Sequence, residues 1–125
     1  MIADTTFVSD LIRERRQGRR GPALEFLAAH RAPAVRLSII TAGEVSVLFP
    51  NATAAWTWLG RWEVLRLHLG VVDAAADLDR LLLGRGERLG ENDNWIAGFA
   101  LYYREPLLSR DLDFDRVPGL RRREY

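Results

Sequence analysis

Carboxylate side chains follow several short apolar segments of this 125-residue chain, and they are the groups with the clearest capacity for chemistry. The set comprises Asp4, Glu44, Asp93 and Asp111, with Asp113 and Asp115 close behind the last. In an open α/β sheet the carboxyl ends of the strands meet along one edge, where ligands bind. The spacing therefore predicts that four separate segments each deliver a carboxylate to the same edge of a sheet.

Such a cluster has a definite chemical consequence. Four unneutralised carboxylates close together repel one another, so they imply a bound cation or raised pKa values. Ligation by oxygen alone, without His or Cys, favours Mg²⁺ or Mn²⁺ over zinc. Two such ions about 3.5–4 Å apart can activate a water and stabilise the leaving oxygen in phosphodiester hydrolysis. Four negative charges also balance two divalent cations.

Each carboxylate has a purely structural interpretation as well. Asp4 could end a strand in a turn, and Glu44 could be the capping-box partner of Thr41, three residues earlier. Asp93 could simply lie at a helix N-terminus, where a negative charge gains about 0.3–1 kcal/mol. Asp111, Asp113 and Asp115 could form an acidic turn, which is a common feature. No single position is specific, and it is their joint placement that favours a site.

Composition excludes several classes of function. The absence of Cys excludes a disulfide scaffold, an iron–sulfur cluster, a Cys-ligated zinc site and thiol catalysis. All 18 basic residues are Arg, so chemistry that needs a P-loop, kinase or Schiff-base lysine is excluded too. No apolar run reaches about 18 residues, and no basic segment leads into an apolar one at the start. We therefore expect a soluble, cytoplasmic protein with no membrane span.

Apolar periodicity then predicts the elements that position these groups. Strands are predicted at residues 1–7, 35–40, 64–69 and 107–109. Helices are predicted after Phe7, from Pro22 to an end at Pro33, from an N-cap at Thr41, and over 52–62, 73–83 and the segment after Glu91. The alternation predicts one α/β domain over residues 1–125, with a mainly parallel central sheet of four to five strands and helices on both faces.

Four short motifs also occur in the order typical of a known family. They are Ile-Ala-Asp-Thr-Thr at 2–6, Ser-Ile-Ile-Thr-Ala-Gly-Glu-Val at 38–45, Glu-Asn-Asp-Asn-Trp-Ile-Ala at 91–97 and Leu-Ser-Arg-Asp-Leu-Asp-Phe at 108–114. Over nearly its whole length the chain resembles a PIN domain. Its short length and its ending at 114–120 are similar to the VapC toxins of bacterial toxin–antitoxin pairs. It departs from the family at Gly43, where Ala is frequent, and at Asn94-Trp95, where aliphatic residues are usual.

The resemblance implies a Mg²⁺-dependent endoribonuclease, with Mn²⁺ as an alternative ion, that is a homodimer and is held inactive by a VapB-like antitoxin. By motif, the catalytic and metal-binding acids are Asp4, Glu44, Asp93 and Asp111, with Asp113 as a substitute for Asp111 or an addition to it. Thr6 and Ser109 carry over as polar supports. We expect Asp4 and Asp93 to bind the principal ion, while Glu44 and Asp111 complete its shell or hold a second one.

Arginines are the candidates for holding an RNA backbone, which would make binding depend on salt. Arg110 is nearest in sequence to the acids, and Arg13 and Arg16 belong to a basic cluster at 13–20. A solvated helix face is the alternative interpretation of that cluster. The segment that holds Trp58 and Trp62 is expected to form core or a dimer contact, with base stacking as the alternative.

Two rival functions remain open at this point. One is a phosphatase or phosphotransferase with Asp4 as its nucleophile, but such sites usually have a second carboxylate two residues later, where this chain has Thr6. They also usually have a Lys on the phosphate, and this chain has none. The other is a non-catalytic PIN-like RNA-binding or assembly module. The complete set of carboxylates argues against it, because a retired site has no reason to keep the electrostatic strain.

Overall fold

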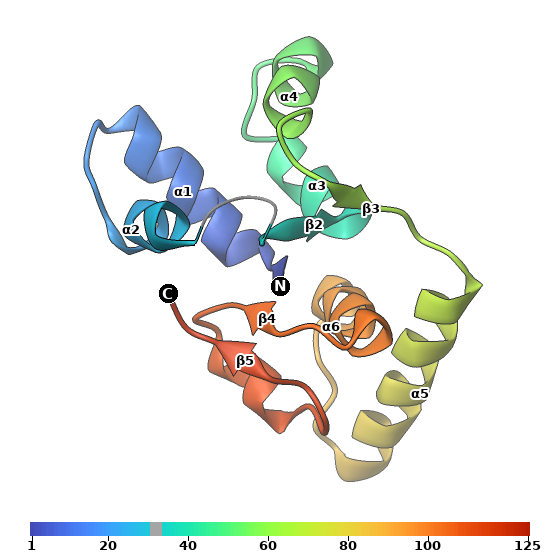
Figure 1. The fold of residues 1–125 in the computed structure, drawn as a ribbon. Helices are drawn as coiled ribbons and strands as arrows, with labels where there is room; N and C mark the ends of the chain where they lie inside the picture. Colours follow the sequence, from blue (N-terminus) through green and yellow to red (C-terminus); the bar gives the residue numbers. More distant parts are fainter. Residues whose placement is uncertain (31–33) are drawn as a thin grey trace.

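The computed structural model describes residues 1–30 and 34–125 and has a five-stranded parallel sheet at its centre (Figure 1). The strands are β1 (Ile2–Ala3), β2 (Arg36–Ser38), β3 (Val64–Leu65), β4 (Leu107–Leu108) and β5 (Arg122–Arg123), in the order β3-β2-β1-β4-β5. The helices are α1 (Thr5–Arg16), α2 (Pro22–Ala29), α3 (Ile39–Ser46), α4 (Ala52–Leu59), α5 (Leu69–Arg85) and α6 (Glu91–Tyr103), with a 3₁₀ turn η1 (Leu112–Arg116). The predicted α/β class with a parallel sheet is confirmed.

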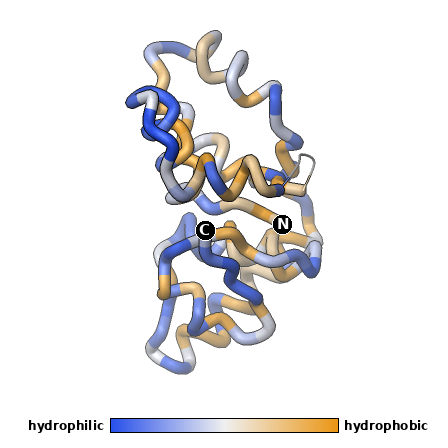
Figure 2. The backbone as a smooth tube through the Cα atoms, turned by 60° about the vertical axis from the view of Figure 1, so that its left-hand side comes forward, coloured by the Kyte–Doolittle hydropathy of each residue, from blue (hydrophilic) through white to orange (hydrophobic). Residues whose placement is uncertain are grey.

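Helices cover both faces of the sheet, as predicted. Successive strand residues point to opposite faces, and Ile2 and Leu107 lie in one buried cluster with residues of α5 and α6. Ala3 and Leu108, the next residues, lie in a second cluster with residues of α1, α2 and α3. Figure 2 shows hydrophobic stretches through the middle of the molecule near the N-terminus and hydrophilic ones at the outer turns. The short strands therefore separate two buried hydrophobic clusters, one on each face of the sheet.

The strand boundaries differ from the prediction, and the site depends on that difference. The first strand was predicted over 1–7 but ends at Ala3, because Asp4 caps a helix that begins at Thr5. The second was predicted to reach residue 40 but ends at Ser38, and α3 starts at Ile39. The remaining strands are also only two residues long. Polar caps, rather than the apolar residues after them, decide where these strands stop.

The predicted capping box at Thr41 is wrong. Ser38 is the N-cap of α3, and its Oγ accepts a hydrogen bond of 3.0 Å from the backbone N–H of Thr41. Thr41 is thus a residue of the first helical turn, and its side chain is fully buried. Glu44 is therefore released from a capping role and makes other contacts. The predicted helix end at Pro33 falls outside the described residues.

The packing of α5 against α6 fixes the helix that carries Asp93. α5 begins at Leu69, four residues before the predicted start, and ends at a left-handed Gly86. At the crossing, a Cβ on Gly98 would lie 2.7 Å from the Cβ of Ala75, so only glycine fits there. The Nδ2 of Asn94 donates a hydrogen bond of 2.9 Å to the Ala75 carbonyl. In the described ranges, no helix is long and apolar enough to cross a bilayer.

Candidate active site

Asp4 lies at the carboxyl end of the central strand and is almost inaccessible, with 2% of its surface exposed. As the N-cap of α1 it accepts a hydrogen bond of 2.9 Å from the N–H of Phe7. The hydroxyls of Thr6 and Ser109 also donate to its carboxylate, Thr6 at 2.8 Å. Burial raises the pKa of Asp4 above its usual range; these hydrogen bonds act in the opposite direction, and the charge of Asp111 adds to the rise. The two predicted polar supports thus both contact Asp4.

Asp93 lies in the first turn of α6 and experiences the charges of the other predicted acids. The pKa of Asp93 is raised from 3.8 to about 6, first by burial and then by the charges of Asp111, Glu44, Asp4 and Asp113, in that order. These residues come from three other segments of the chain. The structure therefore gathers the predicted carboxylates at one edge of the sheet, close enough to disfavour one another's ionisation.

Glu44 reaches the same region from α3, held by two side chains that the sequence analysis did not single out. Thr5 donates its hydroxyl proton to Oε2 of Glu44, and the Nδ2 of Asn92 donates to Oε1 at 2.8 Å. Thr5 is the neighbour of Asp4, and Asn92 is the neighbour of Asp93. The position of these two residues next to acids was the sequence signal that could have identified them. A polar residue beside a carboxylate in a helical turn can contact a side chain on another helix.

The structure distinguishes Asp111 from the acids that follow it. Asp111 caps η1 by accepting a hydrogen bond of 2.9 Å from the N–H of Asp113, and its own N–H donates to Ser109 at 3.0 Å. Asp113 forms an ion pair with Arg116, and Asp115 forms one with Arg122 at 2.7 Å. Of the acids in this segment, Asp111 has the strongest effect on the pKa of Asp93, and Asp113 has a smaller one.

The donor chemistry of this cluster suits a hard divalent cation. All of its charged groups are carboxylates, the ligands that Mg²⁺ and Mn²⁺ prefer. Burial is the main cause of the raised pKa values of Asp4 and Asp93, and the negative charges of neighbouring carboxylates, which a cation would offset, add to both. The carboxylates are not closed into a cage: in the part of the chain that the structure describes, no three His, Asp or Glu residues form a ready ligand set. The fit is one of charge and donor type.

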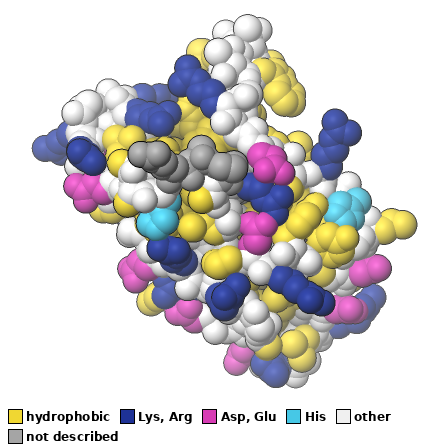
Figure 3. Space-filling model, viewed as in Figure 1, with side chains coloured by type: hydrophobic (Ala, Val, Ile, Leu, Met, Phe, Trp, Pro, Cys, Tyr) yellow, Lys and Arg dark blue, Asp and Glu magenta, His cyan; other side chains and the backbone are white. Residues whose placement is uncertain are grey.

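The three arginines predicted to bind RNA make two separate sets of contacts. Arg13 and Arg110 both pair with Asp10, at 2.5 and 2.8 Å. Arg16 instead donates to the carbonyl of Leu48 at 2.6 Å and lies 5.5 Å from the centre of the Phe49 ring. Figure 3 shows Arg side chains dispersed over the visible face rather than gathered into one stripe.

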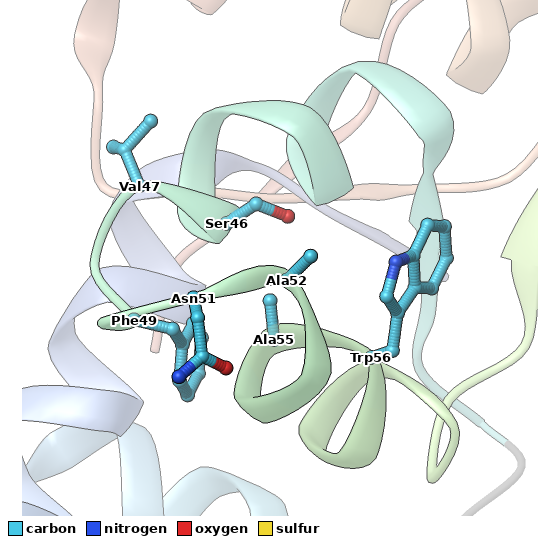
Figure 4. A pocket seen from close by; sticks show the side chains of 7 residues that line it. All are labelled: Ser46, Val47, Phe49, Asn51, Ala52, Ala55 and Trp56. Atoms are coloured by element: carbon cyan, nitrogen blue, oxygen red, sulfur yellow. The ribbon is translucent and has the colours of Figure 1, made fainter.

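An apolar hollow of about 420 Å³ lies between the end of α3 and α4, and none of the four acids lines it. Figure 4 shows the ring of Trp56 at one end and Phe49 with Asn51 at the other. Trp58 packs instead against Trp62, with ring centres 5.4 Å apart, and belongs to the edge of a core cluster. The two histidines lie elsewhere: His30 stacks on Phe26, and His68 contacts Tyr102 edge to face.

Comparison with known proteins gives a family. Residues 1–120 match the PIN domain family. The chain belongs to the PIN domain family. Comparison with curated proteins gives no match.

Among solved structures, this PIN domain is similar to VapBC2 from Rickettsia felis bound to a DNA fragment from its promoter, with a TM-score of 0.79 and 19% identity over 99% of this chain and 97% of the other. It is also similar to VapBC-1 from nontypeable Haemophilus influenzae, with a TM-score of 0.79 and 22% identity over 98% and 96%. A toxin–antitoxin complex from Klebsiella pneumoniae is similar with a TM-score of 0.71 and 24% identity, over 95% of this chain and 93% of the other. At these identities the likeness concerns the fold.

The pKa of Asp93 gives this PIN domain a testable dependence on pH. A carboxyl group with a folded-state pKa of about 6 and an ordinary value of 3.8 adds stability below pH 3.8 and loses it as pH rises through 6. A divalent cation that replaces the proton should therefore raise the melting temperature more at about pH 7.5 than at about pH 5. Thermal melts with Mg²⁺ or Mn²⁺, against NaCl of equal ionic strength, measure this. Equal shifts at both pH values would contradict it.

Proposed function

We propose that this PIN domain is a Mg²⁺-dependent endoribonuclease of the VapC toxin type, which hydrolyses RNA phosphodiester bonds. The observation that carries the proposal is the convergence of four acids from separate segments: Ser109 joins Asp4 to Asp111, and Glu44 is held by the residues next to Asp4 and Asp93. The raised pKa of Asp93, caused by burial and then by these carboxylates, agrees with it. An enzyme that uses a divalent ion at a polyanionic substrate needs such a concentration of negative oxygen ligands. The structural likeness to VapBC and toxin–antitoxin complexes supports the toxin assignment.

In this proposal each acid has a defined part. Asp4 and Asp93 hold the principal Mg²⁺ or Mn²⁺, and Glu44 and Asp111 complete its surroundings or hold a second ion. Asp111 is preferred to Asp113 because Arg116 already pairs with Asp113. When bound, the ion activates a water and offsets the charge that develops at the scissile phosphate.

The polar neighbours fix these carboxylates before any ion arrives. Thr6 and Ser109 hold both oxygens of Asp4, so its carboxylate keeps one orientation at the strand end. Thr5 and Asn92 hold the two oxygens of Glu44 from α1 and α6. Such preorganisation lowers the cost of ordering the ligands when an ion binds.

The proposal extends to partners and location. The protein acts on RNA, forms a homodimer, and is inhibited by a VapB-like antitoxin in the cytoplasm. The similarity to the VapBC structures from R. felis and H. influenzae supports a partner of this kind.

The test is cleavage by the purified protein of pooled tRNA and other structured RNAs, with Mg²⁺ and with EDTA. We expect cutting with Mg²⁺ and none with EDTA, and restoration when Mg²⁺ is added in excess. The ends of the products then identify the bond that is cut. Cleavage that persists in EDTA would overturn the metal-dependent mechanism.

A second candidate is a PIN-like RNA-binding or assembly module without catalysis. The absence of a ready three-ligand set within residues 1–30 and 34–125 is the observation that favours it. Titration with Mn²⁺ separates the two, because a retired site binds the ion poorly whereas a nuclease site shows saturable binding that the substitution Asp4→Asn removes.

A further inference from the structure

Asp10 is a buried carboxylate that holds two arginines from distant parts of the chain. Its side chain is 5% exposed, yet it accepts from Arg13 at 2.5 Å through Oδ1 and from Arg110 at 2.8 Å through Oδ2. Arg13 is one turn along α1, whereas Arg110 follows β4 and immediately precedes Asp111. The contact therefore joins the first helix to the segment that carries one of the acids.

Tyr125 completes this arrangement. Its hydroxyl donates to Oδ2 of Asp10 at 2.8 Å, and its ring packs edge to face on Phe7 with centres 4.9 Å apart. Burial and the contact with Asp10 raise the pKa of Tyr125 well above its usual range, so the phenol keeps its proton at neutral pH. Asp10 is thus fixed by three elements, and its position fixes those of the two guanidinium groups.

The two arginines retain unused binding capacity. Two guanidinium groups against one carboxylate leave a net charge of +1, and the side chains of Arg13 and Arg110 are 56% and 53% exposed. A guanidinium has five N–H donors, and among the contacts of the described residues each of these side chains donates only to Asp10. The remaining donors face solvent, with their direction set by a buried partner.

We propose that Arg13 and Arg110, held by Asp10 and Tyr125, form a phosphate-binding subsite for an RNA backbone phosphate next to the cleaved bond. The assignment rests on the proposed function, because it takes the substrate to be RNA. Arg110 lies between Ser109, which contacts Asp4, and Asp111. In this proposal, the strand whose scissile phosphate lies at the carboxylates also contacts the paired arginines. Arg16 has no part in the subsite, since Leu48 and Phe49 hold it elsewhere.

Binding is measured in EDTA with Asp93→Asn as the parent protein, so that neither metal nor cleavage enters the readout. The probe is a short fluorescein-labelled oligouridylate, followed by anisotropy over a range of salt concentrations. Arg13→Ala and Arg110→Ala should each weaken binding about tenfold, as expected for a lost charge-assisted hydrogen bond, and reduce the salt slope by about 0.7. Arg15→Ala is the matched control, because Arg15 is an exposed arginine on the same helix.

The decisive variant is Asp10→Asn, because the two explanations of how the arginines attract RNA predict opposite changes in affinity. If the arginines attract RNA only as a diffuse positive surface, removing a negative charge strengthens binding. If Asp10 orients them, its loss weakens binding although the net charge becomes more positive. Tyr125→Phe removes the hydroxyl that donates to Asp10. It should also weaken binding, and it serves as the test where Asp10→Asn does not fold.

The subsite is overturned if Asp10→Asn or Tyr125→Phe binds as tightly as the parent or more tightly. It is equally overturned if Arg15→Ala matches Arg13→Ala, or if the parent does not bind the probe. These outcomes are separate from those of the nuclease test. If the wild type cleaves RNA but these substitutions do not affect binding, only the proposed subsite is wrong. If the substitutions weaken binding but the wild type does not cleave RNA, only the proposed nuclease activity is wrong.

Discussion

The substitution Asp93→Asn is expected to abolish RNA cleavage while making the metal-free protein more stable. Asparagine has nearly the same shape as aspartate but cannot supply a negative oxygen ligand to a divalent ion. Loss of a residue in the shell around a metal ligand typically costs 10–100-fold, so loss of a proposed ligand itself should exceed about 100-fold in cleavage rate. The rate is measured on an RNA that the wild type cuts in Mg²⁺.

The gain in stability follows from the sign of the pKa shift. In the folded protein the pKa of Asp93 is about 6, so at neutral pH its ionised form is disfavoured by burial and by the neighbouring carboxylates. Asparagine removes that penalty. Because solvent screens this partly exposed group, we expect only about 1 kcal/mol, or roughly 4 °C in melting temperature, at neutral pH in EDTA. The gain should vanish below about pH 4, where Asp93 is protonated in the wild type as well.

The matched control is Asp73→Asn, which removes an exposed carboxylate from α5. It should leave both the cleavage rate and the melting temperature close to those of the wild type. Wild-type cleavage by Asp93→Asn would remove Asp93 from the site. A melting temperature that falls in EDTA would show that the carboxylates do not repel one another in the folded protein.

The sequence could predict the acids because each one is tied to a local feature. Asp4 follows an apolar strand, Asp111 follows another, and Asp93 opens an apolar helix, so their approach to one sheet edge follows from the topology of a parallel sheet. The exact boundaries could not be predicted in the same way. Ile39 and Ile40 are β-branched and continue a strand pattern, yet the hydroxyl of Ser38 has already capped α3.

Contacts between segments far apart in the chain left no signal in the sequence. Arg110 and Tyr125 meet Asp10 across 100 and 115 positions, and nothing in the charge pattern pairs them. The fifth strand, Arg122–Arg123, has no apolar alternation at all. It forms because its backbone pairs with β4, with Leu107 donating to the carbonyl of Arg121 and Ser109 to that of Arg123 at 2.9 Å. Backbone pairing of this kind is independent of side-chain pattern.

The other large effect is expected at Gly98, where α6 crosses α5. A Cβ there would lie 2.7 Å from the Cβ of Ala75 and 3.1 Å from its Cα, which belongs to the backbone of α5 and cannot turn aside. Gly98→Val must therefore separate the two helices and disturb the hydrogen bond from Asn94 to the Ala75 carbonyl. We expect a loss of about 3 kcal/mol, the upper end for overpacking, and a fall of roughly 10 °C in melting temperature.

Gly84→Ala is the control for that prediction, since it adds a Cβ at a helical glycine of α5 where nothing lies within 4 Å. Alanine is a better helix former than glycine, and Gly84 lies in the last turn of α5, so this variant should melt slightly higher than the wild type. The two substitutions are thus expected to change the melting temperature in opposite directions, and thermal melts in EDTA measure both changes. A Gly98→Val variant as stable as the wild type would mean that α5 and α6 do not pack this closely. Because α6 also carries Asp93, the separation of the helices should lower RNA cleavage as well, at temperatures where the variant is still folded.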